Sequence, residues 1–360
     1  MSTASILQIG LSVTSAINFA VCLVAKKKRE MEFRTVIRPL CRQGLVEHGS
    51  PMLLLGSCFT DNIGKCLRDD LFDVEVNPFG PVYNPMSVLR SLEILRDCQP
   101  IREEELIEVE GLYRSFLFHS RYSAVDSAQA ADMMAASVLS GHETLKCASV
   151  VFLTLGTTRV FRHLASDRIV ANCHKQPAKE FESRCLGFDE TVAVLAECIE
   201  LIRGFNPSAR IVFTISPLRY LESGAHGNQL IKSTLLLAVD EVVKVFGEDV
   251  ASYFPAYEIM MDDLRDYRFY AEDMKHSSSQ AVEYIYEIFR ASYFSPETEK
   301  VAAEARALTR RLSHRIVASS TEAGANEIAA RQRAIRAITE RYPKLTDAIR
   351  RYNDKNTLFK

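Results

Sequence analysis

The sequence lacks an excess of charge of either sign, cysteines paired as CxxC and any glycine-rich nucleotide loop. Its 360 residues carry 44 Lys and Arg against 46 Asp and Glu, a formal net charge of −2. This balance gives no electrostatic reason to expect nucleic acid or an anionic membrane as a partner of the whole chain. Without a Walker or GxGxxG loop, nucleotide binding has no support. We expect no cofactor and no metal.

The nine cysteines are an odd number, at spacings that argue against a disulfide framework or a zinc ribbon. Such a pattern suits a reducing compartment, so we expect a cytoplasmic protein in which most cysteines are small core residues. One of them, Cys58, stands apart because of its position in the sequence.

Residues 1–30 differ from the rest of the chain. Residues 6–25 are mostly apolar with polar interruptions, and the basic residues 26–29 follow them, whereas a secretory signal carries its charges first. We favour an N-terminal extension outside the fold, or an upstream start with Met31 as the real one. A membrane anchor and a cleaved signal are the alternatives. Membrane association is expected only if residues 6–25 act as that anchor.

The C-terminal segment 295–360 is rich in Ala, Arg and Glu and has no glycine between Pro296 and Ala323. Ser295 followed by Pro296 predicts a helix start, and a second helix is expected over 326–341. We expect a charged helical extension that packs on the domain or on a protein partner rather than one that binds nucleic acid. The arginines that could form a basic patch are Arg310, Arg311, Arg315, Arg331, Arg333 and Arg336.

Strand and helix patterns alternate over residues 31–294. Apolar runs bounded by turn residues predict strands buried on both faces at 52–55, 150–155 and 211–216. This order predicts one three-layer α/β/α domain with a parallel, flavodoxin-like sheet, which binds ligands at the carboxyl ends of its strands. Helices are expected from Phe59 through Leu67, from a cap at Asp189 through Leu201 to a stop at Gly204, over 228–246 with Asn228 as its cap, and over 278–294.

The first predicted strand leads into Gly56-Ser57-Cys58-Phe59 and then directly into an amphipathic helix. A nucleophile at such a helix N-terminus would face the helix dipole and free backbone N–H groups, which lower a thiol pKa and stabilise an oxyanion. A tight turn in which Ser57 only caps the helix explains the same residues about equally well.

A second signal lies near the end of the domain, where Asp273 and His276 are three residues apart in a loop before the last helix. A carboxylate at this spacing can orient the imidazole as a general base. Taken alone, a loop aspartate and a surface histidine would be the simpler interpretation.

Together the two signals resemble the layout of the SGNH (GDSL-like) hydrolases. The string Leu55-Gly56-Ser57-Cys58-Phe59-Thr60 is similar to the signature of the GSCFA family, whose last position is usually Ala. The resemblance extends over about residues 31–294. It is carried further by Asn77-Pro78-Phe79-Gly80, Tyr83-Asn84-Pro85, Thr154-Leu155-Gly156-Thr157, Ala171-Asn172-Cys173-His174-Lys175, Gly227-Asn228-Gln229-Leu230 and the run from Tyr253 through Tyr270.

This resemblance implies roles for individual residues. Cys58 occupies the place of the SGNH nucleophile, with Ser57 as the other candidate, and we expect the Cys58 thiol to be largely ionised at neutral pH. Gly80 matches the oxyanion-hole glycine of the second block. Gly156 and Thr158 match the third block, where Thr158 replaces the usual Asn. Loss of one such donor typically costs about 10²–10³ in rate, which puts ordinary esterase activity in doubt.

The remaining candidates are weaker. Adjacent Cys173 and His174 would point to opposite sides of an extended chain, so His174 is expected either to line the pocket or to serve a structural loop. Arg219 follows a buried strand and could reach substrate or form a salt bridge. The acidic residues near 262–266 are expected to pair with neighbouring arginines rather than to bind a metal. Asn77, within the matched motif, is counted with the substrate-binding candidates.

The function expected from these residues is an ester hydrolase or acyltransferase that forms a covalent acyl-enzyme, with an acylated carbohydrate as one substrate class. Cys58 or Ser57 would attack the carbonyl, and His276, oriented by Asp273, would move the proton. The alternative is a binding or interaction protein on a hydrolase scaffold, in which Cys58 is buried and inert.

Overall fold

The centre of the molecule is a parallel β-sheet. The computed structural model describes residues 34–99, 101–314 and 321–357. Numbered along the chain, the sheet strands have the order 2-1-3-4-5, which confirms the flavodoxin-like arrangement. Every neighbouring pair is parallel. From one edge to the other the strands are β2 (Val74–Val76), β1 (Met52–Gly56), β5 (Val150–Leu155), β9 (Arg210–Ile215) and β10 (Ala251–Phe254).

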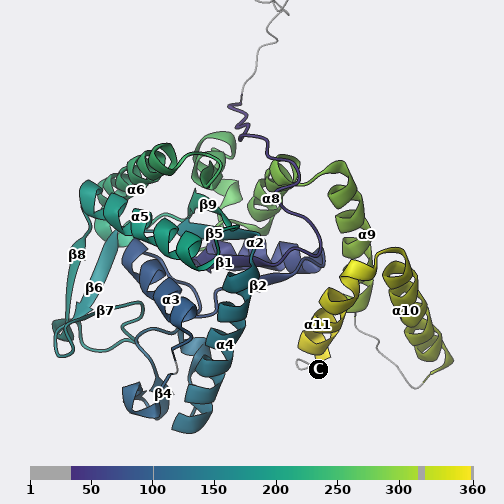
Figure 1. Cartoon of the computed structure of the whole chain (residues 1–360), viewed down its shortest axis with the longest axis horizontal. Coiled ribbons are helices and arrows are strands. Elements are labelled where there is room, and N and C mark those ends of the chain that lie inside the picture. Colours follow the sequence, from purple (N-terminus) through teal and green to yellow (C-terminus); the bar gives the residue numbers. More distant parts are fainter. Residues whose placement is uncertain (1–33, 100, 315–320, 358–360) are drawn as a thin grey trace, which may run out of the picture. The chain divides into compact units, whose positions relative to one another are not determined.

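Helices cover both faces of this sheet (Figure 1). Along β1, Leu53 and Leu55 belong to one apolar core while Met52 and Leu54 belong to the other, because successive side chains of a strand point to opposite faces. The first core is closed by α3 (Pro85–Asp97), α4 (Ser127–Cys147), α5 (Phe188–Phe205) and α6 (Gly224–Phe246), and the second by α2 (Cys58–Asp69) and α8 (Ser279–Tyr293).

Two predicted helix starts are wrong. Helix α5 is capped at Gly187, so Asp189 lies inside its first turn, and the helix continues through Gly204. Helix α6 begins four residues before Asn228, whose side-chain Oδ1 instead accepts the backbone N–H of Tyr220 at 2.8 Å. Neither observed cap, Gly187 or Ser223, makes a side-chain capping bond, so the side-chain capping signal did not mark where these helices begin.

Short strands outside the main sheet were not predicted. A hairpin joins β3 (Ile107–Val109) to β4 (Leu112–Arg114), and an antiparallel sheet has the order β7-β6-β8. Its strands are mostly partly exposed, so they carry no continuous apolar run that could have identified them. They are β6 (Arg159–His163), β7 (Arg168–Val170) and β8 (Phe181–Cys185).

The C-terminal extension forms α9 (Pro296–Ser313), α10 (Glu322–Arg341) and α11 (Thr346–Thr357), of which α11 was not predicted. Ser295 caps α9, as expected. Arg331 is buried, where it pairs with Glu327 and donates to two backbone carbonyls, so it does not contribute to a solvated basic patch. Arg315 and the predicted extension, anchor or signal in residues 1–30 lie outside the described residues.

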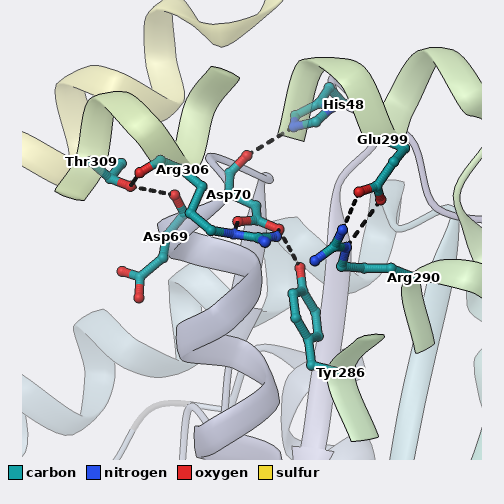
Figure 2. Close-up of polar contacts among 8 residues, drawn as sticks. All are labelled: His48, Asp69, Asp70, Tyr286, Arg290, Glu299, Arg306 and Thr309. Carbon is teal, nitrogen blue, oxygen red and sulfur yellow. Dashed lines mark hydrogen bonds and ion pairs between the residues drawn. The ribbon is translucent and has the colours of Figure 1, made fainter. Parts of the chain in front are cut away.

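The extension is fixed to the domain through Asp70, a fully buried residue that follows α2 (Figure 2). Asp70 Oδ1 accepts a bond from Nε of Arg306 on α9 at 2.6 Å, and Oδ2 accepts the Tyr286 hydroxyl of α8 at 2.7 Å. Beside it, Thr309 donates to the Asp69 carbonyl at 2.6 Å. One carboxylate therefore connects α2, α8 and α9.

The same cluster contains a buried histidine. His48 stacks on Phe72 at 3.9 Å between ring centroids. Its Nε2 lies 2.9 Å from the Asp70 carbonyl oxygen (Figure 2). Burial lowers the pKa of His48 from 6.5 to about 4. The imidazole is therefore neutral in the fold and donates from Nε2.

We expect this histidine to make folding sensitive to mild acid. Between pH 6.5 and about 4 the unfolded chain binds a proton at His48 that the folded chain does not, so stability falls by about 3 kcal/mol as the pH drops through this window. His48→Gln should remove most of that dependence in urea unfolding curves recorded from pH 7 to 4. The substitution of an exposed histidine, His314→Gln, should leave the dependence in place. Equal slopes of the free energy of unfolding against pH in the two variants would contradict this explanation.

The cysteines are less buried than predicted. All eight that are described are free thiols, but only Cys198 is buried, and Cys41, Cys147 and Cys185 are exposed. The expectation that most are core residues is therefore wrong. Across the described part of the chain, no helix combines the length and the apolar character needed to cross a membrane.

Candidate active site

The candidate site begins at the turn after β1. Gly56 has φ +147°, and a Cβ there would lie 2.2 Å from the Thr154 carbonyl oxygen, so the turn requires glycine. Ser57 caps α2: its Oγ accepts the Phe59 N–H at 3.3 Å and donates to Oγ of Ser216 at 2.9 Å. Ser57 is 1% exposed. The turn thus buries the serine and makes Cys58 the first residue of the helix.

The Cys58 thiol is partly buried and its pKa is raised, above all by that burial. The carboxylates of Asp61 and Asp273 raise it further, and together they outweigh the backbone N–H groups of Cys58 and Phe59, which lower it. The expectation of a largely ionised thiol is therefore wrong. At neutral pH the Cys58 thiol is therefore protonated.

Asp273 and His276 form the expected pair in the loop before α8. Asp273 Oδ1 accepts the backbone N–H groups of His276 and Lys275, each at 2.9 Å, and Oδ2 contacts Nδ1 of His276. These bonds hold the pKa of Asp273 well below its usual range. Because Nδ1 faces the carboxylate, Nε2 is the acceptor of a neutral imidazole.

The Asp273 carboxylate of this loop adds to the rise of the Cys58 pKa. Within the described chain no hydrogen bond connects His276 to Ser57 or Cys58. The His276 side chain is 49% exposed, so it is open to a molecule entering the site.

Arg219 supports the loop that carries this pair. Its NH2 group donates to the Met274 carbonyl at 2.5 Å, and its guanidinium lies 4.5 Å from the ring centroid of Tyr270. Met274 has φ +55°, so the arginine holds a strained residue between Asp273 and His276. The sequence left open a salt bridge or a substrate contact, and the observed bond is to the backbone.

Asn77 and Gly80 both take part in the hydrogen bonds that stabilise the turn after β1. Asn77 is fully buried, its Oδ1 accepts the Gly56 N–H at 2.8 Å and its Nδ2 donates to Asp61 at 2.9 Å. The Gly80 N–H, expected in the oxyanion hole, donates to the Asn77 carbonyl at 2.7 Å. A Cβ on Gly80 would lie 2.2 Å from Cβ of His119. In this conformation the Gly80 donor is already occupied.

The third block lies beside the turn. Gly156 donates its N–H to the Tyr83 carbonyl at 2.8 Å, so that donor is occupied too. Thr158, 1% exposed, accepts the Leu186 N–H through its carbonyl at 2.9 Å. Tyr83 is close enough to Cys58 for the thiol to act on its pKa, which burial above all raises to about 12.

His174 belongs to a structural loop. His174 and Lys175 have φ +48° and +58°, so the chain turns here and the expected extended geometry is wrong. The ring is buried and its Nε2 lies 2.7 Å from the Ser115 carbonyl oxygen. Burial lowers its pKa. This contact satisfies His174 without a ligand.

A residue that the sequence did not identify is Lys232 on α6. Its side chain is buried, and Nζ donates to the carbonyls of Gly156 at 2.9 Å and Ser216 at 2.8 Å. The only signal was positional, because Lys232 falls on the apolar face between Asn228 and Leu235, where the helical period calls for a core residue.

The acidic residues near 262–266 are partly paired. Asp262 lies 4.0 Å from Arg265 and Asp266 3.7 Å from Arg268, as expected. Asp263 accepts the Tyr284 hydroxyl at 2.8 Å. Among the described residues no three His, Cys, Asp or Glu are arranged to hold a metal ion.

Two hollows lie elsewhere on the molecule. One of about 500 Å³ runs between α2, α8 and α9 and is bordered by Asn62 and Ser277, the sequence neighbours of Asp61 and His276. The other, of about 890 Å³, lies beside α3 and the short strands. Cys58 lines neither of them.

The chain matches a protein family and is weakly similar to a solved structure. A solved structure of a family two carbohydrate esterase from Clostridium thermocellum in complex with cellohexaose shares 15% identity and a TM-score of 0.30. That match covers 71% of this chain and 65% of the esterase chain. No curated protein matches. Residues 51–289, well over half of the sequence, match the GSCFA family, and the chain therefore belongs to the GSCFA family.

Proposed function

We propose that this protein cleaves or transfers acyl esters through a covalent intermediate on Cys58. The observation that carries the proposal is the Asp273–His276 pair: an imidazole fixed through Nδ1, with Nε2 free and half exposed, on a loop whose carboxylate acts on the Cys58 thiol. A thiol at a helix N-terminus next to an oriented base is the arrangement that nucleophilic catalysis needs.

In the proposed reaction, Cys58 Sγ attacks the acyl carbonyl carbon while its proton passes to Nε2 of His276. The bond from carbon to the alcohol oxygen then breaks, and His276 returns the proton to the departing alcohol. Water or a second alcohol attacks the thioester and gives its proton to His276. The carbon–sulfur bond then breaks, and His276 passes this proton to Cys58 Sγ, which restores the resting thiol. Asp273 remains ionised throughout and holds the imidazolium, as its low pKa requires.

The oxyanion would be held chiefly by the backbone N–H of Cys58 and the α2 dipole, with the Thr158 hydroxyl as a second donor. The Gly80 and Gly156 N–H groups would first have to leave the Asn77 and Tyr83 carbonyls. An oxyanion hole with these donors predicts a slow reaction. The burial of Ser57 supports Cys58 as the nucleophile. A cytoplasmic location is part of this proposal, since free thiols suit a reducing compartment.

The test is to trap the intermediate. We expect a short-chain p-nitrophenyl ester to acylate the wild type at Cys58, as located by mass spectrometry of the peptide. Cys58→Ala should give no adduct, whereas Ser57→Ala should still be acylated. Cys66→Ser is the matched control, because this second partly buried thiol of α2 has a pKa raised to about 11 by burial.

The alternative function, a binding protein on the same scaffold, is favoured by the raised Cys58 pKa and the occupied Gly80 donor. It predicts no adduct with any ester, and a Cys58 that does not react with iodoacetamide at neutral pH. Acylation that persists in Cys58→Ala but disappears in Ser57→Ala would move the nucleophile to Ser57. A panel of O-acetylated sugars, compared with simple alkyl esters, tests the carbohydrate substrate class.

A further inference from the structure

Lys232 is a buried amine at the carboxyl edge of the sheet. It is connected to the nucleophile turn through Ser216, which bonds to both Lys232 and Ser57. It is 1% exposed, and its partners are two backbone carbonyls, Gly156 after β5 and Ser216 after β9. Among the described residues no carboxylate lies within ion-pair distance of it. Burying an ammonium group with only carbonyl partners is unfavourable for folding. An apolar residue of similar volume would stabilise the fold more if the role were purely structural.

The two carbonyls follow β5 and β9, which lie in succession on the same side of β1, the strand that leads into the Cys58 turn. Ser216, whose carbonyl accepts from Lys232, also accepts the Ser57 hydroxyl through its side chain at 2.9 Å. Gly156 donates to Tyr83, the tyrosine beside Cys58. The amine therefore joins the ends of two strands directly behind the residue that caps α2.

The charged side chains that act on the Cys58 pKa are both carboxylates. Asp61 on α2 and Asp273 on the opposing loop both oppose ionisation of the thiol, and Tyr83 faces it as a neutral phenol. His276 on that loop is held by Asp273. On α6, Lys232 is the basic side chain whose pKa is raised by Cys58.

The amine is itself easily deprotonated in this position. Burial lowers the pKa of Lys232 to about 7, while Cys58 raises it. The ring centroid of Tyr257 lies 5.5 Å from Nζ. A thiolate and an ammonium in a water-poor site each favour the charged form of the other.

We propose that Lys232 is a positioning residue that ties the ends of β5 and β9 behind the nucleophile turn and supplies the charge that offsets Asp61 and Asp273 when Cys58 ionises. The role rests on the proposed function only in that Cys58 is the nucleophile. No proton leaves Lys232 in the reaction, since the thiol proton goes to His276.

The test measures alkylation of Cys58 by iodoacetamide against pH, read on the Cys58 peptide by mass spectrometry, so it does not depend on any ester being a substrate. We expect Lys232→Met to react about tenfold more slowly than the wild type at pH 6, where the lysine is charged. The ratio of the wild-type alkylation rate to that of Lys232→Met should approach one near pH 9, where the lysine is neutral. Lys244→Met, an exposed lysine on the same helix paired with Asp240, should match the wild type throughout.

A purely structural role predicts a ratio that does not change with pH, and that result would overturn the proposal. Lys232→Gln, which can keep one bond to a carbonyl, repeats the measurement if Lys232→Met does not fold. The wild type alone gives a further readout: between pH 6 and 8 its alkylation rate should rise by clearly less than tenfold per pH unit. A full tenfold rise per unit would also contradict the proposed coupling.

Discussion

Replacing His276 with alanine is expected to slow acylation of Cys58 by about 10²–10⁴-fold. The resting thiol is protonated, because burial and two carboxylates raise its pKa, so loss of the base leaves no efficient route for its proton. His276 is 49% exposed and its side-chain bond is to Asp273 in the same loop. The free energy of unfolding should therefore change by less than about 0.5 kcal/mol.

Asp273→Asn should reduce the same rate by a comparable factor. The amide can still accept the N–H groups of Lys275 and His276, but it no longer fixes the proton on Nδ1 or stabilises the imidazolium. Single-turnover release of nitrophenolate under excess enzyme measures the acylation step in both variants.

His119 provides the matched control for this experiment. It is a second imidazole near the turn, against Gly80, and its Nδ1 accepts the Arg121 N–H at 3.2 Å. His119→Ala should lower the rate by less than tenfold. A large loss in His119→Ala together with a small one in His276→Ala would assign the base to His119 and refute the proposed pair.

The architecture could be predicted because its determinants are local. Strands buried on both faces appear as uninterrupted apolar runs, so β1, β5 and β9 were recognisable from sequence, and their order with the intervening helices fixed a parallel sheet. The caps at Ser57 and Ser295 were recognisable for the same reason. The short antiparallel strands carry no such pattern.

The properties of the site depend on contacts between distant segments, and sequence could not supply these. The Cys58 pKa is set in part by Asp273, more than two hundred residues away along the chain. The Gly80 N–H is occupied by the carbonyl of Asn77, which the motif alone does not disclose. The position of Lys232 on the apolar face of its helix indicates burial, but only the fold shows that its amine lies between two strand ends.

The link between the domain and its extension leads to the second large effect. Arg306→Met is expected to lower the free energy of unfolding by about 3 kcal/mol, because it leaves the Asp70 carboxylate buried without its cation. The value lies at the lower end of the range for a broken buried pair, since Arg306 is 23% exposed. Methionine retains an apolar stem, so the change tests the charge rather than the packing.

Urea unfolding measures this loss, and two further variants isolate its cause. Lys65→Met removes the exposed ion pair with Asp69, one residue away from Asp70, and should cost less than about 0.5 kcal/mol. Combining Arg306→Met with Asp70→Asn should recover at least half of the deficit, because the amide oxygen can still accept the Tyr286 hydroxyl while the unpaired charge is gone. A double variant as unstable as Arg306→Met alone would contradict this account.

The deficit should also depend on pH, with a definite sign. Burial raises the pKa of Asp70, while Arg306 and Tyr286 hold it down, so removing Arg306 raises it further. In the variant the folded state then binds a proton before the unfolded state does, and stability relative to the wild type improves as the pH falls towards the ordinary carboxylate range. The loss in Arg306→Met should therefore be smaller at pH 5 than at pH 8. A deficit that stayed constant or grew on acidification would mean that packing of α9, rather than the buried charge of Asp70, determines how the extension is held.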